Sequence, residues 1–212
     1  MSASLASAQP PADGTGAAGS SRVEAVSGAS ADARRVLRWI AASGDNLELP
    51  FVIVDKAHAR VLAFDRDGGF KGSAPALIGL GQGDKSPSGT GERRLADIPP
   101  ADRITPAGRF IASLGNDLGK ADILWVDYEN AISLHRLVAG KPEERRARRL
   151  SSESVGDNRI SYGCINVPAK FFDGVIKPLF KRTNGMVYIL PEATPLTEVF
   201  DVSEPTGPRA SS

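Results

Sequence analysis

Apolar and polar positions at the start of the chain follow first a helical and then a strand spacing. Between Asp32 and Ala42, apolar residues at 36, 37, 39 and 40 alternate with basic ones at 34, 35 and 38. This spacing predicts a short amphipathic helix that Ser43-Gly44 ends. Two β-rich runs, 51–54 and 59–64, then flank a four-residue turn, which predicts an antiparallel hairpin with His58 on the exposed turn.

The remaining pattern predicts more strands and one more helix. Strand-like runs that lie next to turn residues alternate with long connections, and one run places aromatic and aliphatic residues on a single helical face. The expected strands are 74–79, 123–126, 131–135 and 185–191, and the expected helix is 168–177. The pattern therefore predicts a mainly β fold with short helices, of the α+β class.

A long connection follows the third expected strand and runs as far as Phe110. Its first residues, Gly79-Leu80-Gly81-Gln82-Gly83, are followed by more loop residues and not by a helix. They therefore complete neither dinucleotide-binding nor Walker spacing, and we interpret them as plain loop. Because unstructured connections of this length are often functional, we expect this one to wall a substrate groove.

Composition divides the chain into three parts. Residues 1–30 are mostly Ala, Ser, Gly and Pro, which predicts a disordered N-terminal tether. Residues 31–200 are expected to form one catalytic domain, and residues 201–212 a flexible tail. Leu5-Ala6-Ser7-Ala8-Gln9 has the small-x-small pattern of a signal-peptidase site without a preceding apolar core. It indicates either a trimmed or mis-started signal or an accident of composition.

Charge and hydropathy exclude some partners. The 26 basic and 25 acidic residues give a formal net charge of +1, so no global field attracts nucleic acid or an anionic membrane. No apolar run approaches the roughly 20 residues of a membrane span. The single cysteine forms no intramolecular disulfide and leaves the redox compartment open.

A charged segment, 141–149, precedes the cysteine. Five basic residues against two acidic ones leave it positive by three charges. Pro142 at a first helical position, with acidic residues next and arginines later, predicts a helix that matches its own dipole. The segment is then either a solvated helix face or a lid or rim that attracts a carboxylate-bearing substrate, for which Arg is the better partner.

The lone cysteine, Cys164, is the main candidate for chemistry. Most free cysteines are small buried hydrophobes, but Gly163 lets backbone come close to a ligand at this position. A thiolate nucleophile needs a base, and the chain has only two histidines, His58 and His135. His135 lies at the end of an expected strand and is the candidate base for Cys164. Backbone N–H groups around Gly163-Cys164 and the Tyr162 hydroxyl are candidate oxyanion donors.

These residues resemble the L,D-transpeptidase catalytic domain family of the YkuD type. The family motif, a histidine followed by Ser/Thr-His-Gly-Cys-hydrophobic-Asn, is matched by His135 and by Ser161-Tyr162-Gly163-Cys164-Ile165-Asn166. Thr105-Pro106-Ala107-Gly108-Arg109-Phe110 is similar to the family's Thr-Pro-x-Gly-x-Phe segment. The resemblance covers about residues 50 to 191 and implies a β-sandwich with a Cys-bearing turn and a following helix.

The resemblance also implies residue roles. Cys164 would be the nucleophile and His135 its general base, with the backbone carbonyl of Arg136 orienting the imidazole. Gly163 and Cys164 N–H groups would hold the oxyanion. The further implied residues are Ser161 and Asn166, which support the turn, and Arg159 and Arg109, which bind substrate. No metal and no organic cofactor is implied.

The implied activity is the remodelling of peptidoglycan. The thiol would cleave the L,D-peptide bond of a tetrapeptide stem and pass the acyl group to an amine. The alternatives are an L,D-carboxypeptidase or endopeptidase of the same fold and a non-catalytic cell-wall-binding module. We expect a monomer in the periplasm or cell wall that carbapenem-type inhibitors acylate. The chain departs from the family at Tyr162, where the motif has histidine, and in the long interval between His135 and Cys164.

Overall fold

The computed structural model describes residues 26, 28–116 and 122–202. Most of the expected tether and tail lies outside these residues. Where the chain is described near its two ends, Val26, Ala29 and Val202 are buried in a common apolar cluster. Both ends of the described chain therefore contribute to packing.

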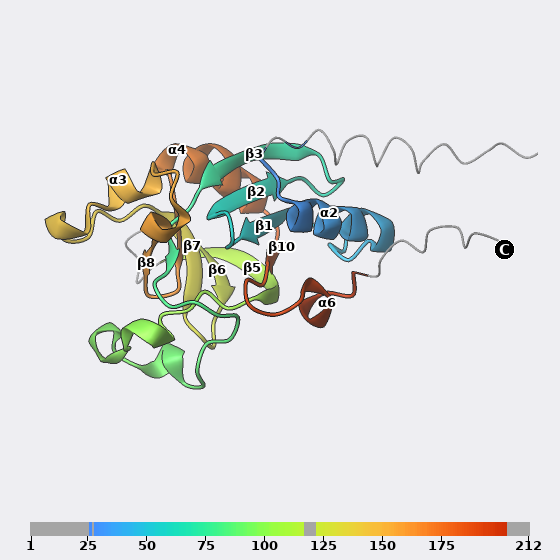
Figure 1. The fold of residues 1–212 in the computed structure, drawn as a ribbon. Coiled ribbons are helices and arrows are strands. Elements are labelled where there is room, and N and C mark those ends of the chain that lie inside the picture. Colours follow the sequence, from blue (N-terminus) through green and yellow to red (C-terminus); the bar gives the residue numbers. More distant parts are fainter. Residues whose placement is uncertain (1–25, 27, 117–121, 203–212) are drawn as a thin grey trace, which may run out of the picture.

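The structure is dominated by one large sheet, which confirms the predicted mainly β, α+β class. Eight strands pair in the order β3-β2-β1-β10-β5-β6-β7-β9 (Figure 1). Their bounds are β1 Phe51–Asp55, β2 Arg60–Phe64, β3 Phe70–Pro75, β5 Gly108–Asn116, β6 Asp122–Asp127, β7 Ile132–Arg136, β9 Ile165–Val167 and β10 Gly185–Ile189. Two short strands, β4 (Ile78–Gly79) and β8 (Arg159–Ser161), form a separate parallel pair.

The long strand β5 joins the two halves of the sheet. Its first part, through Ala112, pairs with β10, and its second part, from Ser113, pairs with β6. Apolar side chains of both halves, among them Val52, Leu134 and Val187, meet in one buried core. The two layers of the expected sandwich are thus parts of a single sheet that changes partners along β5.

Helices cover the sheet on both faces. The segments α4 (Ala169–Phe171), η6 (Phe172–Ile176, a π turn) and α5 (Lys177–Phe180) follow one another directly, and Phe172, Ile176 and Phe180 pack into the core between the halves. The predicted helix at 168–177 is therefore confirmed and extends to Phe180. The opposite face of β2, β1 and β10 is covered by α2 (Ala31–Ser43), which Ser30 caps and Gly44 ends in a left-handed conformation (Figure 1).

The remaining helices are short and lie in the connections. Their bounds are η1 Thr90–Glu92, η2 Leu95–Asp97, η3 Pro100–Asp102, η4 Pro142–Glu144, α3 Arg146–Leu150, η5 Val155–Asn158 and α6 Leu196–Val199.

Three expectations about elements are corrected. The connection expected to be loop as far as Phe110 gives way to β5 at Gly108, a strand of which Ala112 is the one buried residue. The strand expected at 74–79 is divided into β3 and β4. The helix expected to run on from Pro142 is interrupted at Arg145, whose φ of 47° is left-handed, so η4 and α3 are separate.

Candidate active site

Cys164 lies in a tight turn between β8 and β9. The turn depends on Gly163, whose φ is 125°, a value that L side chains rarely adopt. A Cβ there would come within 2.7 Å of both the Ile104 carbonyl oxygen and the Ile132 Cδ1. Only glycine fits this position, and its closeness to two other segments fixes where the following thiol is presented.

Two polar side chains hold the turn from within. The Ser161 hydroxyl accepts a hydrogen bond from the Gly163 N–H at 3.1 Å and donates one to the Cys164 carbonyl at 2.6 Å. The Asn166 Nδ2 donates to the same carbonyl at 3.3 Å. Because the Gly163 N–H is already directed at Ser161, the Cys164 N–H is the better placed of the two expected oxyanion donors.

A buried threonine fastens the turn to the long connection. The Thr105 hydroxyl donates to the Gly163 carbonyl at 2.7 Å and accepts from the Gly79 N–H at 2.9 Å. The sequence indicated this threonine only as the first residue of a motif. Its contacts follow from the chain path, which brings three segments far apart in sequence to one hydroxyl.

His135 is presented by β7, which runs parallel to β9 and places His135 opposite Asn166. Along β7, Leu134 points into the core, so Ser133 and His135 point to the other face. The His135 Nδ1 lies 2.7 Å from the Arg136 carbonyl oxygen. A carbonyl only accepts, so Nδ1 carries the proton and Nε2 of the neutral ring is left as an acceptor.

Although Cys164 is partly buried, its neighbours lower the pKa of its thiol. Burial alone would raise the pKa of the thiol, but the hydrogen bond and charge of His135, helped by Ser133, hold that pKa below its usual value. The Ser133 hydroxyl lies 3.5 Å from Sγ, and the Ala131 carbonyl lies 3.6 Å from it. His135 and Ser133 therefore ease deprotonation of the Cys164 thiol.

Tyr162, the departure from the family motif, faces the long connection. The guanidinium of Arg103 lies 4.1 Å from the centre of the Tyr162 ring, and its Nε donates to the Ile98 carbonyl at 3.0 Å. A cation over an aromatic face is an attractive contact. Tyr162 thus joins the Cys-bearing turn to the segment 98–103.

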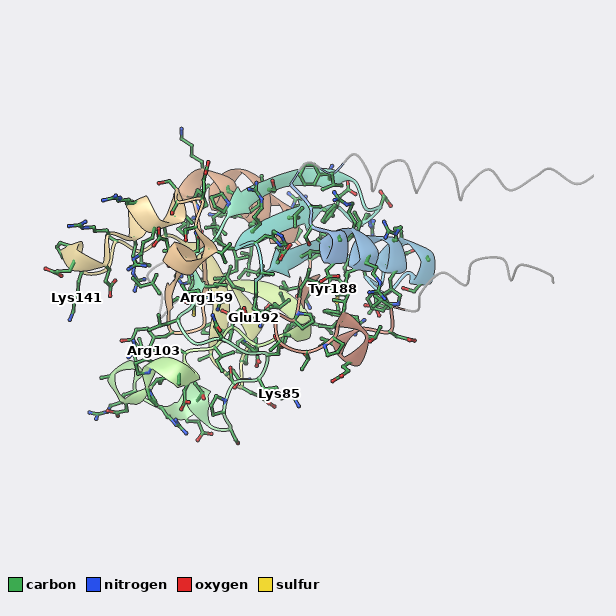
Figure 2. The ribbon with its side chains drawn as sticks, viewed as in Figure 1. Lys85, Arg103, Lys141, Arg159, Tyr188 and Glu192 are labelled. Atoms are coloured by element: carbon green, nitrogen blue, oxygen red, sulfur yellow. The ribbon has the colours of Figure 1, made fainter. Side chains whose placement is uncertain are left out.

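The two arginines expected to bind substrate, Arg159 and Arg109, both have partners within the chain. Arg159 forms an ion pair with Glu192 and donates to the Gly79 and Gly81 carbonyls (Figure 2). Arg109 forms an ion pair with Asp45 at 2.6 Å, on the α2 side of the sheet. Both guanidinium groups are engaged by the chain's own oxygen atoms, and their role in substrate binding stays a prediction.

The structure also places Arg136 and His58, the other charged groups named from the sequence. The Arg136 guanidinium pairs with Asp173 at 2.5 Å, so only its backbone carbonyl serves His135. His58 lies on the exposed β1–β2 turn, with 58% of its side chain accessible, and contacts Asp55. It does not join the group around Cys164.

A buried lysine was missed by the sequence analysis. Lys56, fully buried although it follows β1 in the turn, donates from Nζ to the Asp84 carboxylate at 2.7 Å, the Gly83 carbonyl at 2.6 Å and the Thr105 carbonyl at 2.9 Å. Nothing in the turn sequence distinguishes it from a solvated lysine. It secures the long connection one residue from the contact between Ile104 and Gly163.

Within the described residues, no group of three or more His, Cys, Asp or Glu side chains is arranged to hold a metal ion. None of the described helices has both the length and the apolar content that a membrane crossing needs.

The fold and site together define a sheet-dominated α+β domain with a Cys-His pair. No family model matches the sequence, and no curated protein matches it. Solved structures with a similar fold include an L,D-transpeptidase from Xylanimonas cellulosilytica (17% identity, 66% of this chain and 60% of that chain, TM-score 0.39). Others are the helical cell shape determining protein Pgp2 from Campylobacter jejuni (16%, 69% and 49%, TM-score 0.44) and the LD transpeptidase LdtMt1 in complex with imipenem (15%, 66% and 58%, TM-score 0.37). The chain spans about half to three-fifths of their lengths.

Proposed function

We propose that this protein is a cysteine-dependent L,D-transpeptidase that acts on peptidoglycan peptide stems. The observation that carries the proposal is the Cys164 thiol, whose pKa His135 lowers, within a turn that matches the family motif at every position but Tyr162. A lowered thiol pKa beside a correctly oriented imidazole suits nucleophilic attack on an amide.

The proposed reaction has two halves. The Cys164 thiolate attacks the carbonyl carbon of the L,D-peptide bond, a C–S bond forms, and the Cys164 N–H stabilises the oxyanion. The His135 imidazolium then gives its proton to the leaving amine, the C–N bond breaks, and the terminal D-amino acid departs. An acceptor amine next attacks the thioester and loses its proton to His135, the C–S bond breaks, and the thiolate returns.

Hydrolysis is the second candidate, because the chain departs from the family motif at Tyr162. If water takes the place of the amine, the same residues give an L,D-carboxypeptidase. Arg103 stacks on Tyr162 beside the nucleophile, where the family motif has a histidine, so the surroundings of the acceptor differ from those of the motif. A non-catalytic wall-binding module has less support, because such a module needs no acidic thiol.

The decisive experiment incubates purified protein with disaccharide tetrapeptides and identifies products by mass spectrometry. Cross-linked dimers support transfer, and tripeptides alone support hydrolysis. His135→Ala should abolish either product, whereas His58→Ala on the distant turn is the matched control and should retain activity. Absence of any product that depends on Cys164 would refute both enzyme proposals.

A carbapenem offers a second probe of the nucleophile. We expect a covalent adduct at Cys164 by mass spectrometry and none in Cys164→Ala. A peptidoglycan substrate would place the protein in the periplasm or cell wall, and the monomeric state stays an expectation that light scattering can check.

A further inference from the structure

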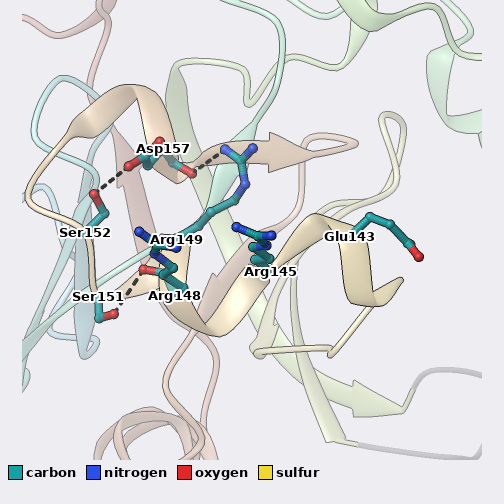
Figure 3. Close-up of a pocket in the computed structure, with 7 residues that line it drawn as sticks. All are labelled: Glu143, Arg145, Arg148, Arg149, Ser151, Ser152 and Asp157. Carbon is teal, nitrogen blue, oxygen red and sulfur yellow. Dashed lines mark hydrogen bonds between the residues drawn. The ribbon is translucent and has the colours of Figure 1, made fainter.

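An arginine-lined hollow lies beside α3, outside the group around Cys164. Its volume is about 710 Å³, and Arg145, Arg148 and Arg149 line it together with Ser151 and Ser152 (Figure 3). Sites for small ligands commonly have volumes of about 300–1,000 Å³. The hollow therefore has room for one or two acidic groups and the chain that carries them.

The three arginines are unequally engaged. Arg149 is held in place, since its Nε donates to the Glu144 carbonyl at 3.0 Å and its Nη1 to the Asp157 carbonyl at 3.1 Å. Arg145 and Arg148 are exposed, and neither has a carboxylate within 4.0 Å in the described part of the chain. Their charges are available to a ligand.

The acidic residues of the hollow do not neutralise it. The Asp157 carboxylate accepts a hydrogen bond from the Ser152 hydroxyl at 2.7 Å, and Glu143 is exposed on the rim. Three guanidinium groups thus face two carboxylates. The left-handed backbone of Arg145, unusual for a residue with a Cβ, reverses the chain so that Arg145 and Arg148 line the same hollow.

The hollow lies within reach of a long substrate at the nucleophile. Asp157 and Cys164 are seven positions apart in the chain, and an extended chain spans at most about 3.5 Å per residue, which limits the separation of their Cα atoms to roughly 25 Å. A polymer with repeated peptide branches can contact both places at once. Arginine forks match carboxylate groups with two parallel hydrogen bonds.

We propose that this hollow binds carboxylates of a second peptide stem on the same polymer while one stem occupies Cys164. The identity of the polymer rests on the proposed function, but carboxylate binding does not. The hollow gives the protein a preference for multiply anionic, polymeric substrate over a single stem.

Binding is tested apart from turnover. Cys164→Ala protein is titrated with a short poly-glutamate peptide and, separately, with polyphosphate, at low and at physiological salt. The double variant Arg145→Gln/Arg148→Gln should bind poly-glutamate about tenfold more weakly. The matched control, Lys181→Gln/Arg182→Gln, removes two exposed charges after α5 and should bind as the parent does.

Equal weakening by both double variants, tighter binding of polyphosphate, or no binding of poly-glutamate would overturn the proposal. The thermal midpoint of each variant checks folding. With active protein, the Arg145→Gln/Arg148→Gln change should lower turnover of polymeric peptidoglycan and leave kcat/KM on a single tetrapeptide unchanged. Turnover of the single tetrapeptide tests the proposed function alone, so the two failures are distinguishable.

Discussion

Replacement of Lys56 by methionine should damage both stability and the thiol site. The Lys56 ammonium is buried and donates to Asp84, Gly83 and Thr105. Methionine has a similar volume but no charge, so the packing around the side chain is largely kept. The change removes three charge-assisted hydrogen bonds and leaves the Asp84 carboxylate buried without its counter-ion.

The magnitude follows from what remains around Asp84. Removal of one partner of a buried pair costs about 3–5 kcal/mol. Asp84 still accepts hydrogen bonds from the backbone N–H groups of Glu192, Ala193 and Thr194 at 2.7–2.9 Å and from the Thr194 hydroxyl. These donors offset part of the loss, so we expect the lower end, about 3 kcal/mol.

Urea unfolding of wild type and Lys56→Met measures this loss. Lys71→Met is the matched control, because Lys71 pairs with Asp65 at a similar distance, 2.6 Å, but both side chains are accessible. An exposed pair contributes about 0–1 kcal/mol. If the two variants lose the same free energy of unfolding, the reasoning about burial is refuted.

The pH dependence of the free energy of unfolding is a second test of Lys56→Met. Burial raises the pKa of Asp84, but Lys56 and the three backbone donors outweigh it and lower that pKa well below its usual range. A carboxyl with a depressed folded pKa stabilises above its unfolded pKa of about 3.9, and the stability is lost as pH falls below that value. The free energy of unfolding of wild type should therefore fall as the pH drops below about 3.9. The fall should be less steep in Lys56→Met, where the pKa of Asp84 rises.

Three further predictions concern the turn. His135→Asn should raise the pKa of the Cys164 thiol toward its ordinary value, because the lowering hydrogen bond and charge are lost; alkylation rates against pH should shift to higher pH, and an unchanged profile would contradict the pairing. Gly163→Ala should cost about 1–3 kcal/mol in urea unfolding, whereas Gly174→Ala, with nothing within 4 Å of the new Cβ, should not destabilise, so similar losses would argue against strain. Tyr162→Phe should keep the ring contact with Arg103, and Tyr162→Ala should lose about 1 kcal/mol; equal thermal midpoints for the two variants would discount this contact.

The sequence predicts elements best where side-chain pattern alone determines them. The α2 helix and the β1–β2 hairpin carry clear periodicity and lie where it predicts. Gly163 was recognisable because a tight turn constrains residue type within a few positions, whereas Ser161 was expected only from the resemblance to a family motif. Such local requirements on residue type can be recognised in a single sequence.

Features that depend on distant partners were not predictable in this way. β5 alternates half-exposed residues and becomes a strand because β10 and β6 flank it. Lys56 looks like a turn residue until the chain returns at Asp84, and Arg159 looks available until Glu192 reaches it. Lys56 and Asp84 lie 28 residues apart and Arg159 and Glu192 lie 33 apart, beyond the range of any local pattern.

The placement of the nucleophile depends on these distant partners. Gly79 admits no Cβ because the Arg103 carbonyl occupies that space, and Thr105 links Gly79 to Gly163. Lys56 donates a hydrogen bond to the Thr105 carbonyl at 2.9 Å. The turn therefore receives its geometry from this buried network as well as from its own Ser161 and Asn166. It follows that the motif residues alone, moved to another loop, would not reproduce the lowered pKa of the thiol, since His135 reaches Cys164 and Thr105 reaches Gly163 only in the folded chain.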